Sequence, residues 1–338
     1  MRPDPRARRF VNFAWATLAF NLAVVAWGAF VRASGSGAGC GSHWPLCNGQ
    51  VVPLDAHTAT LIEFTHRVTS GVALLLVVGL TVWSRRLYPR GHAARLGAGV
   101  AMAFMISEAL VGAGLVLLGL VADNSSITRA IVLGIHLVNT FFLLAFITLT
   151  AWWGAGRARP HPRSDPMLAV LLGIGLVGTL AVGVAGAITA LGDTLFPVAT
   201  LAEGVQQDFS ATAHFLIRLR IIHPVLAVVL GFYILILAAI IRARRADATT
   251  RALAGALIGL FLAQLAIGAF NIALHAPIWM QLVHLMMADA VWLILILMSV
   301  STLAADRATF RSREDSPTSP AIGGIVPGDD RIPAIGAR

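Results

Sequence analysis

Eight long apolar runs constrain the fold of this chain more than any other feature of its sequence. Each has about 20 residues or more, the length that a helix needs to cross a bilayer. Hydrophobic residues make up 57% of the 338 residues and charged residues 12%, about half the charged share of a soluble domain. The sequence therefore predicts an all-α membrane protein with eight transmembrane helices. The expected spans are residues 10–32, 63–84, 96–121, 128–153, 167–190, 215–241, 252–274 and 278–304.

The positive charge of the chain predicts how these spans are oriented. Arginine supplies all of it, because the sequence has no lysine. The arginines gather at the N-terminus and in every second connection, whereas the other connections carry aspartate and glutamate. Positive connections stay inside, so we expect a protein of the cell membrane with both termini cytoplasmic. Short basic clusters between apolar runs also favour membrane lipid over nucleic acid as the partner. The basic segments are residues 2–9, 85–95, 157–163, 242–251 and 307–313.

The two halves of the chain carry similar motifs in the same order. GAFVRASGSG resembles GAITALGDT, and EALVGAG resembles QLAIGAF. The spacing between paired motifs changes only slowly along the chain, as in a duplicated unit. The sequence therefore predicts two tandem pseudo-symmetric four-helix bundles, related by an axis along the membrane normal. The aligned positions are Gly28 with Gly186, His66 with His223, Glu108 with Gln264, and His136 with His284.

The composition changes after about Ala305, where the apolar pattern gives way to proline, glycine and charged residues. Such a segment cannot bury enough apolar surface to fold alone, and we expect it to be disordered. The expected organisation is a cytoplasmic N-terminus (1–9), an N-terminal bundle (10–153), a cytoplasmic linker (154–166), a C-terminal bundle (167–304) and a cytoplasmic tail (305–338).

The repeat singles out four histidines, one in each even-numbered span: His66, His136, His223 and His284. One intramembrane histidine is often a simple helix contact. Four at equivalent positions indicate function, because ionisable groups at membrane depth are costly. Zinc usually takes three or four protein ligands, whereas haem iron takes two axial ligands from facing helices. Each bundle is therefore predicted to hold one haem between two histidines.

The residues that precede the histidines differ between the halves. Glu63 comes three residues before His66, and Arg220 comes three residues before His223. On a helix, each would project over the same face as its histidine. A carboxylate can move protons or stabilise developing positive charge, whereas a guanidinium suits a haem propionate. We therefore expect a reacting site in the N-terminal half, with Glu63 as catalytic residue, and a holding site in the C-terminal half. Alternatively, Glu63 pairs with Arg67 at i+4, and both roles are compatible.

The loop SGSGAGCGSHWPLCNG, residues 34–49, holds the only two cysteines, Cys40 and Cys47. The predicted orientation places this loop outside the cell, where an oxidising compartment permits a disulfide. Two free thiols, a dithiol that reports redox state, or a metal site that also uses His43 are the alternatives.

These features together resemble the haem A synthase family over about residues 10–304. The matching residues are GAFVRASGSGAGC and WPLC after the first span, EFTHR at residues 63–67, and the single histidine of each even span. The resemblance implies an enzyme that oxidises a ring methyl of haem O to the formyl group of haem A. It implies a haem b held by His223 and His284, and substrate haem O at His66 and His136. The family's loop disulfide maps to Cys40 and Cys47. Arg67 and Arg220 are further candidates for contacts with the haem propionates.

Oxidation of a methyl group to an aldehyde takes two successive two-electron steps. The sequence carries no nicotinamide, flavin or iron–sulfur motif, so we expect an external electron donor. The haem O-producing enzyme is a further expected partner. A bis-histidine haem protein that carries electrons without substrate chemistry is the alternative function, although it leaves Glu63 unexplained.

Overall fold

The structure is a computed structural model that describes residues 4–54 and 56–314, with backbone only from residue 305 onward. Within these residues it is helical and contains no β-strand. Eight helical segments are long and apolar enough to cross a membrane, which confirms the predicted all-α architecture. The spans are α1 (Pro5–Ala33), α2 (Thr58–Leu87), α3 (Ala93–Leu117), α4 (Ile127–Gly154), α5 (Pro166–Leu195), α7 with α8 (Phe215–Arg244), α9 (Ala248–Ala273) and α10 (Ile278–Glu314).

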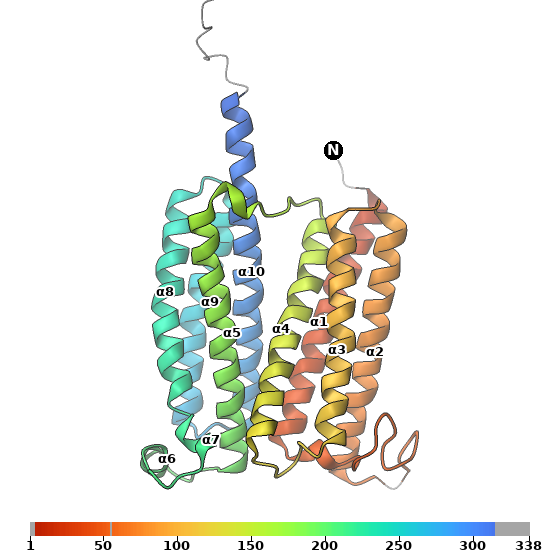
Figure 1. The fold of residues 1–338 in the computed structure, drawn as a ribbon, viewed down its shortest axis with the longest axis vertical. Helices are drawn as coiled ribbons and strands as arrows, with labels where there is room; N and C mark the ends of the chain where they lie inside the picture. The colour runs from red at the N-terminus through yellow and green to blue at the C-terminus, as the bar shows by residue number, and fades with distance from the viewer. Residues whose placement is uncertain (1–3, 55, 315–338) are drawn as a thin grey trace, which may run out of the picture.

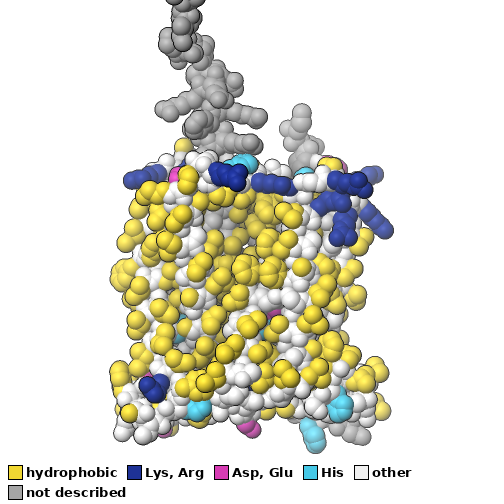
Figure 2. Space-filling view, viewed as in Figure 1, with side chains coloured by type: hydrophobic (Ala, Val, Ile, Leu, Met, Phe, Trp, Pro, Cys, Tyr) yellow, Lys and Arg dark blue, Asp and Glu magenta, His cyan; other side chains and the backbone are white. Residues whose placement is uncertain are grey.

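The helices form two groups that stand side by side (Figure 1). One group contains α1 to α4 and the other contains α5 and α8 to α10, each with its own cluster of buried apolar side chains. The groups meet where α1 and α4 pack against α5 and α10. Apolar side chains also cover the outer surface between the two ends of the molecule (Figure 2), as expected for helices that face lipid.

Charge is distributed unequally between the two ends of the molecule. Most of the arginine side chains visible in Figure 2 gather at the end where α1 begins and α10 leaves the bundle. The loop that follows α1 and the short helix α6 (Leu201–Asp208) lie at the opposite end (Figure 1). The basic connections of the sequence are thus brought together on one end, which we call the arginine end.

The sixth span differs from the continuous helix that the sequence predicts. It is broken into α7 (Phe215–Arg218) and α8 (Ile222–Arg244), with a turn at residues 219–221. The cause is Pro224, which has no N–H to donate and whose ring would clash with the carbonyl of Arg220 four residues earlier. In the N-terminal half Arg67 stands at the position aligned with Pro224, and α2 continues without a break.

Several helix ends differ from their predicted positions, those of α3 and α10 among them. The helix α3 ends at Leu117 rather than at residue 121, because Gly119 adopts a left-handed φ of 63°. The amide of Leu120 then donates to the carbonyl of Leu115, which closes the helix in a Schellman motif. At the other extreme, α10 continues to Glu314, ten residues into the segment predicted to be disordered. That stretch is free of proline and glycine. The rest of the predicted tail, 315–338, lies outside the described residues.

One side chain joins the two groups of helices near the end opposite to the arginine end. Arg32, at the end of α1, donates from Nη1 to the carbonyl of Ala190 and to Oγ1 of Thr194, both at 2.7 Å. Its Nη2 donates to Oε1 of Gln281 at 3.0 Å. Ala190 is the residue that the repeat aligns with Arg32. A contact between aligned positions is what a two-fold axis between the halves would produce, and the pseudo-symmetry stays a prediction.

Candidate functional site

Each of the four membrane histidines packs its imidazole against a glycine of a neighbouring helix. A β-carbon built on three of these glycines would lie 2.9–3.0 Å from an imidazole carbon, closer than carbon atoms normally pack, and the fourth would lie at 3.9 Å. Glycine therefore makes room for three of the rings, whereas a β-carbon at Gly112 would meet His136 at an ordinary contact distance. The pairs are His66 with Gly28, His136 with Gly112, His223 with Gly186, and His284 with Gly268.

The C-terminal pair has a geometry that suits one metal ion between two imidazoles. The ring centroids of His223 and His284 lie 6.1 Å apart, with the ring planes perpendicular. Two metal–nitrogen bonds of about 2 Å, together with the two ring radii, span roughly 6 Å. Nδ1 of His223 lies 3.1 Å from the carbonyl oxygen of Val182. A proton on Nδ1 serves that bond, which leaves Nε2 free to bind a metal.

The N-terminal pair brings in a carboxylate that the sequence analysis missed. His66 lies within electrostatic reach of His136, and both histidines interact with Glu108 of α3. Oε2 of Glu108 lies 3.4 Å from Nδ1 of His136. The signal that could have identified Glu108 is its alignment with Gln264, which places an acid in one half against an amide in the other.

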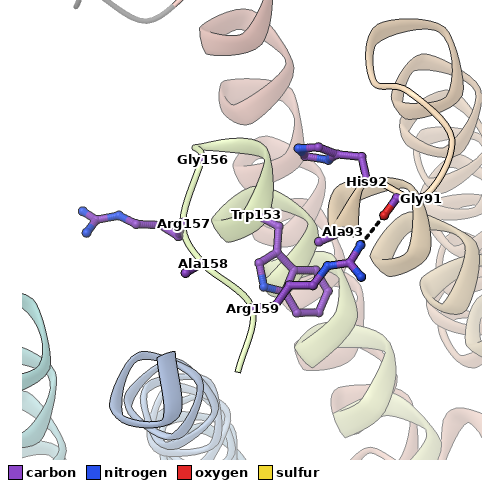
Figure 3. Close-up of a pocket in the computed structure, with 8 residues that line it drawn as sticks. All are labelled: Gly91, His92, Ala93, Trp153, Gly156, Arg157, Ala158 and Arg159. Atoms are coloured by element: carbon purple, nitrogen blue, oxygen red, sulfur yellow. Dashed lines mark hydrogen bonds between the residues drawn. The ribbon is translucent and has the colours of Figure 1, made fainter. Parts of the chain in front are cut away.

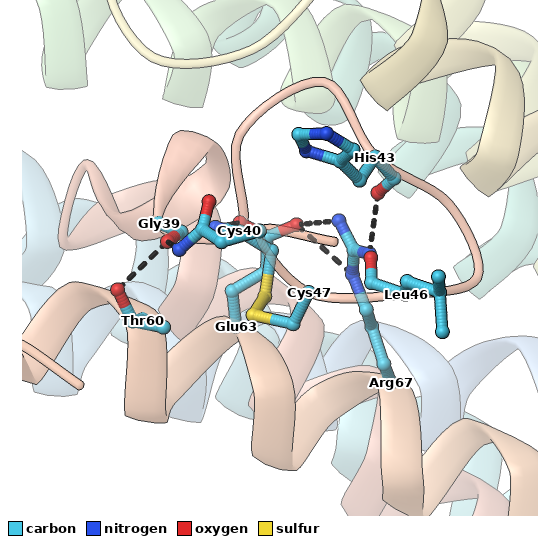
Figure 4. A network of polar contacts seen from close by, with 9 residues as sticks. Gly39, Cys40, His43, Leu46, Cys47, Thr60, Glu63 and Arg67 are labelled. Carbon is cyan, nitrogen blue, oxygen red and sulfur yellow. Dashed lines mark hydrogen bonds and ion pairs between the residues drawn. A yellow bond between two sulfur atoms is a disulfide. The ribbon is translucent and has the colours of Figure 1, made fainter. Parts of the chain in front are cut away.

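Glu63 faces the cysteine loop, where both of its oxygens are engaged (Figure 4). Oε2 accepts the backbone N–H of Cys40 at 2.8 Å, and Oε1 pairs with Nη2 of Arg67 at 2.5 Å. The residue is 3% exposed. The expected i+4 pairing with Arg67 is confirmed, whereas a catalytic role for Glu63 stays a prediction.

The cysteine loop is bound tightly to α2. Cys40 and Cys47 are joined by a disulfide, as the resemblance implied. Nη1 of Arg67 donates to the carbonyls of His43 and Leu46, at 2.7 and 2.6 Å. Beside the disulfide, Gly39 approaches the α2 backbone so closely that any side chain there would collide. Glu63 and Arg67 therefore form a buried clamp between the loop and the helix that carries His66.

Arg220 lies in the α7–α8 turn rather than on the helix of His223, because the helix breaks before Pro224. Both side chains nevertheless face α5, where Nε of Arg220 lies beside Gly192 and the imidazole of His223 lies beside Gly186. Its Nε lies 3.3 Å from Oδ1 of Asp193, and its Nη2 donates to the carbonyl of Phe196 at 2.8 Å. Nη1 lies 3.9 Å from Oδ1 of Asp208. Burial raises the pKa of the Asp208 carboxyl, and the guanidinium offsets part of that rise.

A cavity of about 330 Å³ lies at the arginine end (Figure 3). It is remote from the histidines, because His136 and Trp153 are 17 residues apart on α4, about 25 Å along a helix. His92 accepts the N–H of Ala94 on its Nδ1 at 3.2 Å and so caps α3. Burial lowers the pKa of His92, and the charge of Arg159 lowers it further. The cavity is lined by Gly91, His92, Ala93, Trp153, Gly156, Arg157, Ala158 and Arg159.

Comparisons with known proteins show which family this chain matches. Residues 11–296 match the cytochrome oxidase assembly protein family COX15-CtaA. A protein of Thermus thermophilus named protoheme IX farnesyltransferase is 48% identical over 299 residues, which are 88% of this chain and 49% of that protein. The chain thus spans about half the length of this relative. A heme A synthase of Exiguobacterium sibiricum is 31% identical over 215 residues, 63% of this chain and 69% of that enzyme. A heme A synthase of Shouchella clausii is 43% identical over 98 residues, 29% of this chain and 33% of that enzyme.

Proposed function

Since the chain belongs to the COX15-CtaA family of cytochrome oxidase assembly proteins, the family of the haem A synthases, we propose that it oxidises a ring methyl of haem O to the formyl group of haem A. The observation that carries the proposal is the presence of two histidine pairs on equivalent helices with unequal neighbours. One pair is accompanied by a carboxylate, and the other by a backbone carbonyl and an amide.

The name of the Thermus relatives describes a different reaction, farnesyl transfer to protohaem. About half of that polypeptide lies outside the match, so the name can refer to the unmatched half. Prenyl transfer from a diphosphate commonly uses grouped carboxylates that hold Mg²⁺. Within residues 4–54 and 56–304, no group of three His, Cys, Asp or Glu side chains is placed so that it could hold a metal ion. Farnesyl transfer yields haem O, which supports a haem O-producing enzyme as the partner of this chain.

The C-terminal pair is the proposed holder of haem b. His223 and His284 fit an iron between them by their spacing, and the bond to Val182 fixes the tautomer of His223. When bound, haem b supplies one-electron redox chemistry at its iron. Arg220 is already neutralised by Asp193 and Asp208, so any contact of its guanidinium with a propionate would compete with those carboxylates.

The N-terminal pair is the proposed site of substrate haem O. His66 and His136 would orient the macrocycle between α2 and α4, and Arg67 stays a candidate for a propionate contact. Glu63 lies one helical turn before His66. Its carboxylate is the proposed catalytic group, which stabilises positive charge that develops at the methyl carbon. In the clamp the same carboxylate is held by Arg67 and by the Cys40 amide.

The oxidation removes four electrons from the methyl carbon in two steps and adds one oxygen atom, so it needs an oxidant. With dioxygen as the oxidant, each step also consumes two electrons from outside the chain, and we propose an electron donor in the same membrane as their source. We further propose that the protein resides in the cell membrane with the arginine end, and hence both termini, in the cytoplasm. A topology reporter fused after Arg313 should be active only in the cytoplasm. Activity outside would reverse the assignment of every loop.

Pigment extraction from the purified protein tests the proposed function. Protein made in cells that produce haem O should yield haem b together with haem O or haem A. Haem b alone would favour the electron carrier without substrate chemistry. Protein that never carries haem, even when haem b and haem O are supplied, would refute both functions.

A further inference from the structure

Glu108 reaches from α3 into a polar face of α4. Oγ1 of Thr140 donates to Oε1 of Glu108 at 2.5 Å, and Nδ2 of Asn139 donates to Oε2 at 2.5 Å. Nδ1 of His136 lies 3.4 Å from the same Oε2. The three α4 residues are spaced i, i+3 and i+4, so they lie on one face of the helix. Glu108 thus meets three polar groups that a single helix presents together.

These contacts determine how Glu108 and His136 act on each other. Thr140 and Asn139 each donate a hydrogen bond, so both carboxylate oxygens serve as acceptors. An acceptor beside Nδ1 of His136 favours the imidazole tautomer that carries its proton on Nδ1. Nε2 of His136 is then left with a free lone pair. The carboxylate lies behind the imidazole, on the side away from the atom that would bind iron.

The equivalent place in the C-terminal half carries none of this chemistry. The alignment of His136 with His284 pairs Asn139 with Met287 and Thr140 with Ala288. Gln264 replaces the carboxylate. Its amide nitrogen lies 3.1 Å from the backbone carbonyl of His284 and 3.4 Å from Nε2. The anion and both of its donors are therefore found in one half only.

We propose that Glu108 is a positioning residue of the N-terminal site, which acts through His136 on the haem bound there. A carboxylate behind a ligating histidine raises the basicity of that ligand. Its negative charge also favours the more positive oxidation state of the metal. The N-terminal haem consequently has a lower reduction potential than it would have with an amide at residue 108. This inference rests on the proposed function, because it requires a haem at His136.

A spectroscopic redox titration tests the inference without measuring turnover. The full-length protein is purified from cells that make haem b and haem O, and the reduction of each bound haem is followed by its absorbance. Variants His136→Ala and His284→Ala identify the signals, since each removes the haem of its own half. Glu108→Gln should shift the midpoint potential of the N-terminal haem upward and leave that of the C-terminal haem unchanged.

Thr140→Val is the second variant, and it decides the matter if Glu108→Gln fails to bind haem. It keeps the carboxylate but removes one of its two donors. It should therefore shift the midpoint potential of the N-terminal haem by less than Glu108→Gln and leave that of the C-terminal haem unchanged.

Two results would overturn the inference, and they can be told apart. If both haems are bound and neither midpoint potential changes in either variant, Glu108 is only a helix-packing contact. The proposed function would then still stand. If the His136→Ala variant keeps every haem signal of the wild-type protein, no haem is bound at His136. That result would overturn the inference together with the proposed substrate site.

Discussion

The two halves of the molecule place their histidines alike and surround them differently. In both, one imidazole packs against a glycine of the first helix and the other faces a glycine of the third. In the C-terminal half, a backbone carbonyl fixes the tautomer of His223. In the N-terminal half, a carboxylate stands behind His136. The comparison teaches that the helical framework provides the ligand positions, while a few neighbouring side chains decide what the bound group can do.

The outer ends of the halves differ as much as the sites. The N-terminal half has a continuous α2 to which Glu63 and Arg67 clamp a disulfide loop. The C-terminal half has a helix break, closed by Arg220 and two aspartates. Each half thus buries an arginine near its site, but only one of these arginines remains on the helix of its histidine.

The largest expected effect is the loss of haem b, which should follow histidine substitutions in the C-terminal half only. His223→Ala or His284→Ala should remove most of the stably bound haem b, because each leaves one axial position without a ligand. The low-spin absorption spectrum of the purified protein measures this loss. His66→Ala and His136→Ala are the matched controls and should leave the haem b spectrum nearly intact. A normal low-spin spectrum in both C-terminal variants would contradict the proposal that the C-terminal half holds haem b.

The next effect concerns Glu63. Glu63→Gln keeps the shape of the side chain but removes its charge, and it should lower the rate of haem A formation by about two to four orders of magnitude. Haem O should accumulate in membranes of cells that make it, and haem b should be retained. Haem extraction from those membranes gives the ratio of haem A to haem O.

Glu203→Gln is the control for Glu63→Gln, because Glu203 also accepts a backbone N–H at the outer end of the molecule, but in the other half. It should leave haem A unchanged. If the Glu63→Gln variant makes as much haem A as the wild type, the Glu63 carboxylate has only the structural role of holding the cysteine loop to α2.

A smaller effect is expected where the halves meet. Arg32→Gln removes hydrogen bonds from a charged group to Ala190 and Thr194, each worth about 1.5–3 kcal/mol. The variant should unfold at lower temperature in detergent than the wild type. Arg90→Gln, an exposed arginine at the other end, should not. Equal melting temperatures for all three proteins would mean that the Arg32 contacts do not hold the halves together.

The smallest effect compares the caps of equivalent helices. The lowered pKa of His92 means that the folded state disfavours the charged imidazole. Its cap on α3 is therefore complete above the ordinary histidine pKa of about 6.5 and is lost as the pH falls below it. The loss is at most that of one N-cap, about 1 kcal/mol.

Hydrogen exchange between pH 7.5 and 5.5 measures this difference. After correction for the intrinsic rate, the amide of Ala94 should lose protection as the pH falls. Thr250 is the control, because it is capped by the carboxylate of Asp247 at the start of α9. Parallel behaviour of the two amides would argue against a titrating cap.

Much of the fold followed from hydropathy alone, because a span needs only length and apolar composition. The equivalence of the four histidines followed from the repeat, and the structure places each beside its own glycine. The orientation of Glu63 did not follow, since helical spacing places a side chain on a face but does not say which loop packs there. Glu108 was missed because its partners are on another helix. Pro224 could be seen in the sequence, but the helix break before it could not be predicted. A proline near the start of an apolar run does not by itself fix where the helix begins.

The bond from Arg32 to Ala190 bears on how such a chain can evolve. A residue on a two-fold axis meets its own counterpart, so in a dimer of identical four-helix subunits an arginine at this position would face a second arginine. The two like charges would repel each other. Two halves that are encoded separately can instead place an arginine opposite an alanine, as Arg32 and Ala190 are placed here. In one fused polypeptide, selection can therefore change one of the two residues that meet at the axis without changing the other. Two identical subunits do not allow this.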